Sequence, residues 1–291
     1  MKTIFFGLPG NEEMTKQLCG LIEGELAEFT LRRFPDEETY LRITSSLEAK
    51  RCVIVCSLNH PDNKIISLYY LCRLCRDLKA SKVILVAPYL SYMRQDIQFL
   101  TGEAVSSEYF ANLLSQWVDE LITIDPHLHR KHSMAELFTI PCTVLHAAPT
   151  IAEWILKSID KPVLIGPDIE SEQWVSEAAR NINAPYTVLL KTRLGDRDVK
   201  VSVPRVEMYE DHTPVLIDDI ISTARTMIET VGHLKNTGMK APAIIGVHAI
   251  FAGNAFEDLQ KAGAGQIITC NTIQHISNKI DLTRLIASSL Y

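Results

Sequence analysis

The chain has 291 residues, of which 47% are hydrophobic and 22% are charged, and its formal net charge is −6 at pH 7. This composition is typical of a globular protein, and the length is sufficient for two domains of about 150 residues each. The negative charge and the absence of a basic run longer than Arg130–Lys131 exclude nucleic-acid binding through a phosphate-tracking surface. Residues 1–8 show no signal-peptide pattern, and no apolar run reaches the roughly 18 residues that span a bilayer, so we expect a soluble cytoplasmic protein with no membrane partner.

In chain order, short β-branched runs alternate with longer segments of helical period. The first series of expected strands is Thr3–Phe6, Cys52–Cys56, Val83–Ala87, Glu120–Ile124 and Thr143–Leu145. The second series is Val163–Ile165, Tyr186–Leu190, Val199–Val203, Val215–Ile217, Ala243–His248 and Gln266–Thr269. Expected helices are Asn11–Ile22, Lys64–Lys79, Ser106–Gln116, Thr150–Lys157, Ser171–Asn181, Thr226–Thr237 and Ala255–Ala262. This alternation predicts βαβ units, mostly parallel sheets and an α/β fold class.

The stretch Pro141–Pro149 separates the two series, so we expect two domains, residues 1–146 and 147–291. Both halves repeat the strand–helix rhythm, which suggests duplication, although no residue-level repeat is visible. Ligands of open parallel sheets bind beyond the carboxyl ends of the strands, and the candidate motifs described below follow expected strands.

The seven cysteines include Cys72 and Cys75, which form a CxxC pattern inside an expected helix. Such a pair could be a redox or metal site. No second CxxC lies nearby, and the flanking residues alternate as on a packed helix face. We therefore favour reduced core thiols.

The first motif, Arg33–Glu38, follows a strand-like segment. Phe34 could stack on a purine, and Asp36 or Glu38 could accept a hydrogen bond from an exocyclic amine or bind a metal. By itself the stretch favours the simpler reading, an acidic turn with Phe34 in the core.

The second motif, Pro88–Asp96, follows the expected strand Val83–Ala87. Arg94 offers a planar fork for phosphate oxygens, and Gln95 offers an amide for a base edge. A loop in which Arg94 pairs with Asp96 is an equally good interpretation.

The third motif, Asp125–His132, ends another strand. The spacing of His127 and His129 suits zinc, but the cysteine ligands of a structural zinc site do not accompany it. Mg²⁺ prefers few protein ligands plus substrate phosphates, so a magnesium–nucleotide role is better supported, with one of the three histidines functional. Asp168, after the strand Val163–Ile165, could hold hydrated Mg²⁺ or cap the next helix.

The fourth motif, Lys191–Asp198, also ends a strand. Lys191 and Arg193 stand two residues apart, so their side chains point the same way on an extended chain. Gly195 and the mixed charges around it are typical of a mobile lid that brings cations to a phosphoryl transition state. A solvated hairpin tip is an equally good interpretation.

The most informative stretch is Val215–Thr226, where an apolar strand ends in Asp218 and Asp219. The two carboxylates can accept hydrogen bonds from vicinal hydroxyls. The turn Ser222–Thr226 offers hydroxyls and backbone N–H groups at a helix N-terminus, which favours an anion. Together these features fit a ribose 5-phosphate, while the alternative is a plain strand–turn–helix with an acidic cap.

Taken in order, these motifs resemble those of the ribose-phosphate pyrophosphokinase family over essentially the whole chain. The matching stretches are Arg33–Tyr40, Pro88–Asp96, Asp125–His127, Pro167–Asp168, Lys191 with Arg193, Asp218–Thr226 and His248–Gly253. The resemblance implies two phosphoribosyltransferase-like domains and transfer of the diphosphoryl group of MgATP to ribose 5-phosphate. It also suggests a homo-oligomer.

The resemblance assigns roles to four groups of residues. Those expected to place ATP are Phe34, Asp36, Glu37, Glu38, Arg94 and Gln95. Those expected at the ribose 5-phosphate are Asp218, Asp219, Ser222, Thr223, Ala224, Arg225 and Thr226. His127 and Asp168 would bind Mg²⁺, and Lys191 and Arg193 would be catalytic.

The chain departs from the family pattern at several positions. Glu170, Ser171 and Arg225 stand where the family usually has glycine, and a glycine at position 225 would permit a positive φ or close backbone approach. Ile97 and the segment Thr101–Ser107 differ from the basic residues of phosphate-activated members, so we do not extend phosphate activation, ADP inhibition or hexameric assembly to this chain. Two alternatives stay open, a type I phosphoribosyltransferase and a non-catalytic regulatory homologue.

Overall fold

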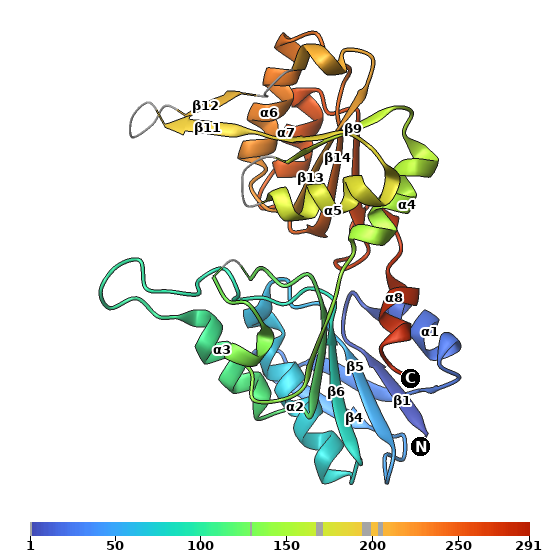
Figure 1. The fold of residues 1–291 in the computed structure, drawn as a ribbon. Coiled ribbons are helices and arrows are strands. Elements are labelled where there is room, and N and C mark those ends of the chain that lie inside the picture. Colours follow the sequence, from blue (N-terminus) through green and yellow to red (C-terminus); the bar gives the residue numbers. More distant parts are fainter. Residues whose placement is uncertain (1, 129, 167–170, 194–198, 203–205) are drawn as a thin grey trace. The chain divides into compact units, whose positions relative to one another are not determined.

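The computed structural model describes residues 2–128, 130–166, 171–193, 199–202 and 206–291 (Figure 1). The chain forms two compact units. Unit 1 contains Met1–Leu145 together with Thr283–Tyr291, and unit 2 contains His146–Leu282. None of the helices in the described part of the chain is long and apolar enough to cross a membrane.

Unit 1 is built on a six-stranded parallel sheet with the order β2-β1-β5-β6-β7-β8. Helices α2 and α3 cover one face, and α1 and α8 cover the other (Figure 1). Its strands are β1 (Thr3–Gly7), β2 (Glu25–Leu26), β5 (Arg51–Val55), β6 (Lys82–Ala87), β7 (Glu120–Ile124) and β8 (Cys142–Leu145), with the separate hairpin β3 (Phe29–Arg33) and β4 (Thr39–Ile43). Its helices are α1 (Glu12–Leu21), α2 (Ile65–Asp77), α3 (Ser106–Ser115) and α8 (Thr283–Ser288).

Unit 2 is built on a second six-stranded parallel sheet, with the order β10-β9-β13-β14-β15-β16. Helices α6 and α7 pack on one face and α4 and α5 on the other (Figure 1). Its strands are β9 (Pro162–Gly166), β10 (Tyr186–Val188), β13 (Thr213–Ile221), β14 (Ala243–Ala249), β15 (Gln266–Cys270) and β16 (Asn278–Ile280), with the separate hairpin β11 (Leu190–Arg193) and β12 (Val199–Ser202). Its helices are α4 (Ala148–Ser158), α5 (Glu172–Ile182), α6 (Arg225–Asn236) and α7 (Ala255–Ala262).

The two units have the same strand topology. In unit 1, β1 lies between β2 and β5, and β6, β7 and β8 continue the sheet in order. In unit 2, β9 lies between β10 and β13, and β14, β15 and β16 continue it in the same way. In both units a two-stranded hairpin precedes the third strand of the sheet along the chain. The hairpins β3–β4 and β11–β12 therefore occupy equivalent topological places. The repeated rhythm of the sequence thus corresponds to a repeated topology.

The C-terminal residues differ from the expected domain division. The boundary lies between Leu145 and His146, and Thr283–Tyr291 pack with unit 1 rather than with the 147–291 domain. Helix α8 lies against α1, and Arg51 donates a hydrogen bond to the carbonyl oxygen of Leu290. The Tyr291 hydroxyl donates to the carbonyl oxygen of Leu21 at 3.0 Å. These contacts attach the C-terminal residues to α1 and to the first sheet.

A few expected strands are placed differently. Val199–Val203 does not join the second sheet, because residues 199–202 pair antiparallel with β11. Tyr186–Leu190 is divided, since β10 ends at Val188 and β11 begins at Leu190. The short elements β2, β16 and α8 and the hairpin β3–β4 have too little periodic pattern to be predicted from the sequence.

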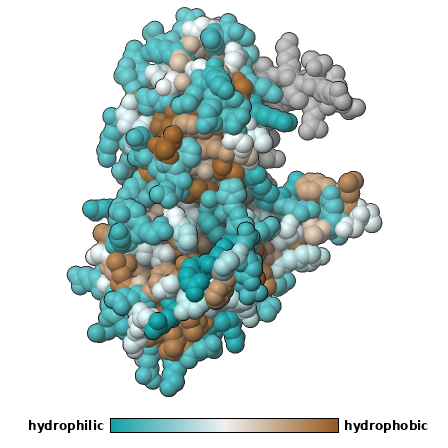
Figure 2. Space-filling model, turned by 180° about the vertical axis from the view of Figure 1, so that it is seen from behind, coloured by the Kyte–Doolittle hydropathy of each residue, from teal (hydrophilic) through white to brown (hydrophobic). Residues whose placement is uncertain are grey.

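The cysteine prediction is confirmed within the described residues. Cys72 and Cys75 are fully buried in the core between α2 and the first sheet, and the cysteines are free thiols. Apolar side chains also reach the surface, where Figure 2 shows them in several separate areas of the face in view.

Candidate functional site

The site in unit 2 begins at the switch point of its sheet. Strands β9 and β13 are parallel neighbours, with Leu216 opposite Ile165. From β9 the chain continues to β10 on one side, and from β13 it continues to β14 on the other. Because ligands of open α/β sheets bind beyond the carboxyl ends of strands at such a point, the loop after β13 is the candidate ligand loop.

Asp218 and Asp219 lie inside β13, which extends to Ile221 and is therefore longer than the expected Val215–Ile217. Both carboxyl groups are partly buried. Oδ1 of Asp218 accepts a hydrogen bond from the backbone N–H of Asp219 at 3.0 Å, and Oδ1 of Asp219 accepts from the N–H of Ile220 at 2.7 Å. Each carboxylate is thus oriented by the backbone of the next residue, which fixes where its other oxygen points.

The loop that follows is held at its start. The N–H of Phe251 donates to the carbonyl oxygen of Ile221 at 2.8 Å, and the N–H of Ala252 donates to that of Ser222 at 3.1 Å. These bonds attach the loop after β13 to the loop after β14. Thr223 is exposed and Thr226 is partly buried in the first turn of α6.

The positive φ of this loop is at Ala224, with φ 56°, and not at Arg225. Of the two reasons considered for a glycine at position 225, the structure does not show the positive φ. Arg225 is the first residue of α6 and is exposed, so its long side chain causes no backbone strain. The strained residue is the alanine before it.

The hairpin β11–β12 lies beside α6. In the pairing of β11 with β12, Lys191 is opposite Val201 and Arg193 is opposite Val199. Residues 194–198, which include most of the expected lid, and Asp168 lie outside the described residues.

His248 in β14 is a functional candidate that the motif reading left without a role. It is 1% exposed, and its Nδ1 is 3.0 Å from Oγ1 of Thr272. The Thr272 hydroxyl donates its single hydrogen to the carbonyl oxygen of Val247 at 2.7 Å, so its oxygen accepts from a protonated Nδ1 of His248. This contact fixes the ring at the carboxyl end of β14, one strand away from Asp218.

In unit 1, the Arg33–Glu38 motif is the tip of the hairpin β3–β4. The N–H of Phe34 donates to the carbonyl oxygen of Glu38 at 2.8 Å, and Glu37 has φ 71°. Phe34 is 40% exposed, so its expected place in the core is wrong. The acidic turn itself is present, and Asp36 is exposed on it.

An arginine supports the exposed Phe34 ring. The guanidinium of Arg32 lies 4.7 Å from the ring centroid of Phe34 and 4.3 Å from that of Tyr40, which is its cross-strand partner. The two rings meet edge to face at 5.8 Å. This cation–π cluster stabilises a surface ring that would otherwise be poorly fixed.

The Pro88–Asp96 motif forms the loop after β6. Arg94 is exposed and Asp96 pairs with Arg130, which contradicts the alternative interpretation in which Arg94 pairs with Asp96. The side-chain oxygen of Gln95 accepts a hydrogen bond from the Ser106 hydroxyl at 2.7 Å. Because this bond uses the side-chain oxygen of Gln95, its NH₂ group is the part of the amide that can donate a hydrogen bond to a ligand.

His127 lies in the loop after β7 and is partly exposed. Asp125, at the start of the same loop, is 3% exposed and has a φ of 39°. Because β6 and β7 are parallel neighbours, Arg94, Gln95 and His127 follow the same edge of the first sheet. The described residues contain no group of three or more His, Cys, Asp or Glu side chains arranged to hold a metal. His129, the other member of the zinc-like spacing, lies outside them.

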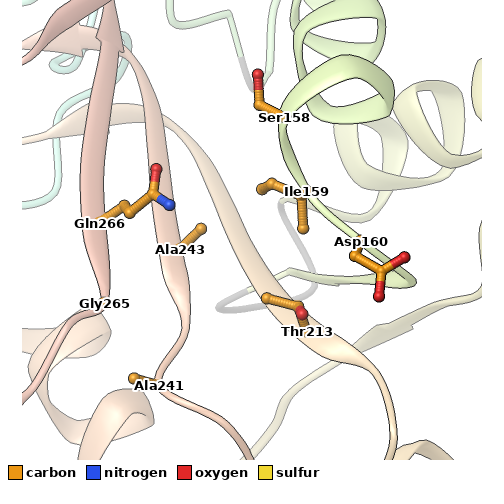
Figure 3. Close-up of a pocket in the computed structure, with 8 residues that line it drawn as sticks. All are labelled: Ser158, Ile159, Asp160, Thr213, Ala241, Ala243, Gly265 and Gln266. Atoms are coloured by element: carbon orange, nitrogen blue, oxygen red, sulfur yellow. The ribbon is translucent and has the colours of Figure 1, made fainter.

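A cavity of about 240 Å³ lies in unit 2 at the opposite edge of its sheet (Figure 3). Its lining includes Thr213, Ala243 and Gln266, the first residues of β13, β14 and β15. The Asp218–Thr226 stretch lies at the carboxyl end of β13, so this cavity is separate from the candidate site.

The comparisons with known proteins agree with this arrangement. A family model described as the N-terminal domain of ribose phosphate pyrophosphokinase matches residues 3–117, and a phosphoribosyl transferase domain model matches residues 139–284. The chain is 31% identical to a ribose-phosphate pyrophosphokinase of Methanobrevibacter smithii over 99% of both chains. It is 30% identical to that of Saccharolobus solfataricus, over 99% of this chain and 100% of the relative.

One solved structure has the same fold over the whole chain. It is the phosphoribosylpyrophosphate synthetase from Mycobacterium smegmatis, with a TM-score of 0.87, 20% identity, and coverage of 100% of this chain and 98% of that one. The match of both domain models in order, with full-length relatives at about 30% identity, covers nearly every motif described above. The chain therefore belongs to the ribose-phosphate pyrophosphokinase family.

Proposed function

We propose that the protein transfers the diphosphoryl group of MgATP to the anomeric hydroxyl of ribose 5-phosphate. The hydroxyl oxygen attacks the β-phosphorus, the bond from the β-phosphorus to the oxygen shared with the α-phosphorus breaks, and the hydroxyl proton is lost. The products are phosphoribosyl diphosphate and AMP. The observation that carries the proposal is the β13–α6 element, in which two oriented carboxylates near the end of the strand are followed by a short loop and a helix N-terminus.

This element has the donors and acceptors that the sugar phosphate needs. Asp218 and Asp219 would accept hydrogen bonds from the vicinal ribose hydroxyls. The backbone N–H groups and hydroxyls of residues 222–226 would bind the 5-phosphate at the positive end of the α6 dipole. The exposed Arg225 would add a charge-assisted contact to the same phosphate.

The nucleotide would be placed by unit 1. Phe34 would stack on the adenine, with Asp36, Glu37 and Glu38 near its amino group. Arg94 would contact phosphate oxygens and Gln95 a base edge. The first set lies on an exposed hairpin turn and the second on the loop after β6, as ligand contacts on a rigid scaffold commonly do.

His127 and Asp168 would hold Mg²⁺, and the donor set fits an ion that keeps most of its coordination for water and phosphate. When bound, the ion would neutralise charge on the β- and γ-phosphates. Lys191 and Arg193 would stabilise the additional negative charge on the transferred group in the transition state. Both residues belong to β11, whose partner strand β12 lies beside α6, and this placement supports the role.

The test is AMP release from ATP and Mg²⁺, with and without ribose 5-phosphate, and with and without inorganic phosphate. We expect AMP only when the sugar phosphate is present, with no dependence on inorganic phosphate. Absence of AMP in every condition would contradict the proposal and favour a regulatory homologue. The variant Arg225→Gly would then show whether this departure from the family pattern removed the activity.

A phosphoribosyltransferase would consume phosphoribosyl diphosphate rather than make it. The match of residues 3–117 to the pyrophosphokinase N-terminal domain supports the synthetic reaction. Incubation with adenine and phosphoribosyl diphosphate tests the alternative directly, and we expect no AMP from that mixture.

A further inference from the structure

We propose that Arg130 is a positioning residue for MgATP, because its ion pair with Asp96 ties the loop of Arg94 and Gln95 to the loop of His127. The inference rests on the proposed function, which assigns these two loops to the nucleotide and its metal. Neither the motifs nor the family resemblance gave Arg130 a role.

The pair joins a buried carboxylate to a half-exposed cation. Nη1 of Arg130 lies 2.7 Å from Oδ1 of Asp96, and their side chains are 48% and 6% exposed, respectively. A carboxylate withdrawn from water in this way is costly unless a cation compensates it. The loop conformation that buries Asp96 therefore depends on Arg130.

Arg130 also contacts the outer part of the same loop. Its guanidinium carbon lies 5.5 Å from the ring centroid of Phe99, whose side chain is 59% exposed. The turn around Phe99 is closed on itself, because Oε2 of Glu103 accepts hydrogen bonds from the N–H groups of Phe99 and Leu100 at 2.9 and 3.0 Å. The turn thus holds its own shape, and Arg130 attaches it to the loop after β7.

The remaining contacts show why this attachment matters. Gln95 is held to the start of α3 by the Ser106 hydroxyl and by the N–H of Ser107, at 3.2 Å from its carbonyl oxygen. The loop after β7 has its own contact with α3, between Lys131 and Glu108 at 3.7 Å. The Asp96–Arg130 pair is a polar side-chain contact directly between the two loops.

Two loops that bind one ligand need a fixed spacing. Arg94 follows β6 and His127 follows β7, so they reach the nucleotide and its ion from neighbouring strands. Hydrogen bonds and ion pairs to the ligand weaken when their geometry departs from the ideal, so a shift of one loop relative to the other would weaken binding. Loss of Arg130 would leave the spacing of the loops free to vary while Lys191 and Arg193, on unit 2, stay unchanged.

The experiment compares KM for MgATP and kcat in the wild type, Arg130→Ala and Arg130→Lys. We expect Arg130→Ala to raise KM for MgATP about tenfold with kcat within about twofold, because the change affects placement of the nucleotide. Arg130→Lys should restore most of the affinity, since one N–H donor makes the contact. The matched control is Lys131→Ala, which removes the adjacent cation and its more exposed pair with Glu108 and should leave both constants unchanged.

A double-mutant cycle with Asp96→Asn separates the ion pair from other effects of Arg130. If the pair carries the role, Asp96→Asn should raise KM in the wild type and add little in the Arg130→Ala background. Additive effects in the cycle would contradict the proposal, as would an unchanged KM in a folded Arg130→Ala variant. Circular dichroism shows whether Arg130→Ala folds. If it does not fold, KM for MgATP is compared between Asp96→Asn and Arg130→Lys, and an unchanged KM in both variants would overturn the proposal.

Binding of the uncleavable analogue α,β-methylene-ATP with Mg²⁺, measured by calorimetry, keeps this test separate from the proposed reaction. An inactive wild type that binds the analogue, with weakened binding in Arg130→Ala, would contradict the reaction and support the positioning role. An active wild type whose analogue affinity does not change in Arg130→Ala would support the reaction and contradict the role. A wild type that neither reacts nor binds the analogue would contradict both.

Discussion

The carbonyl oxygen of Ala224 accepts the first helical hydrogen bond of α6, from the N–H of Ile228 at 2.8 Å, while Ala224 itself has φ 56°. The helix that would hold the 5-phosphate therefore starts from a residue in the left-handed region. For a residue with a Cβ this conformation costs about 1–2 kcal/mol. The strain lies in the loop that the proposed reaction uses.

Ala224→Gly is expected to raise the free energy of unfolding by about 1 kcal/mol, because glycine adopts a positive φ without the steric penalty. Urea denaturation measures the change. Ala262→Gly, at the last position of α7, is the control and should lower stability by about 1 kcal/mol, since there glycine replaces an alanine in a right-handed helix. A loss of stability in Ala224→Gly would show that the positive φ is not strained.

Lys191→Ala is expected to lower kcat about 100-fold or more, because it removes a cation that stabilises charge developed in the transition state. Steady-state AMP release measures it. Lys200→Ala is the control, as Lys200 is opposite Thr192 on the neighbouring strand of the same hairpin and has no proposed contact with substrate. A near-normal kcat in Lys191→Ala would remove it from the catalytic group.

Asp218→Asn is expected to raise KM for ribose 5-phosphate about tenfold or more, because a charged acceptor for the ribose hydroxyls becomes a neutral amide. The fold should be kept, since the asparagine oxygen can still accept from the N–H of Asp219. Asp258→Asn, an exposed carboxylate in the first turn of α7, is the control. An unchanged KM for the sugar would exclude Asp218 from its binding.

The buried thiol of Cys56 makes stability depend on alkaline pH. Burial raises the pKa of Cys56 from 9.0 to about 12. Between these values the unfolded chain loses the proton and the folded chain keeps it, so stability is fully present below pH 9 and falls as pH rises toward 12, by about 1.4 kcal/mol per pH unit.

Urea denaturation at pH 8, 9, 10 and 11 tests this dependence. Cys56→Ala should have a shallower decline than the wild type, because its unfolded state has one thiol fewer to ionise. Val55→Ala, a fully buried neighbour that does not titrate, should lower stability at every pH and leave the slope unchanged. Equal slopes in the wild type and Cys56→Ala would contradict the prediction.

The sequence predicted the larger elements well because their residues form continuous periodic patterns. Strands such as Val83–Ala87 and Glu120–Ile124 are buried apolar runs, and the structure has them as β6 and β7. The hairpin β3–β4 was not among the expected elements, and its strands are only partly buried and lie outside the two parallel sheets. Arg94 and His127 follow strand ends, as the parallel fold requires, whereas Asp218 and Lys191 lie inside strands, and the partners in space were often different.

By itself, the sequence determined the α/β class, the order of the motifs and the strand ends that carry them, since local periodicity and turn residues encode all three. The tertiary structure decided that Asp96 pairs with Arg130, that Ala224 takes the positive φ, and that Thr283–Tyr291 return to unit 1. Arg130 is 34 positions from Asp96, and Leu290 is 239 positions from Arg51. Such contacts depend on how distant segments pack, and no short window of sequence contains that information.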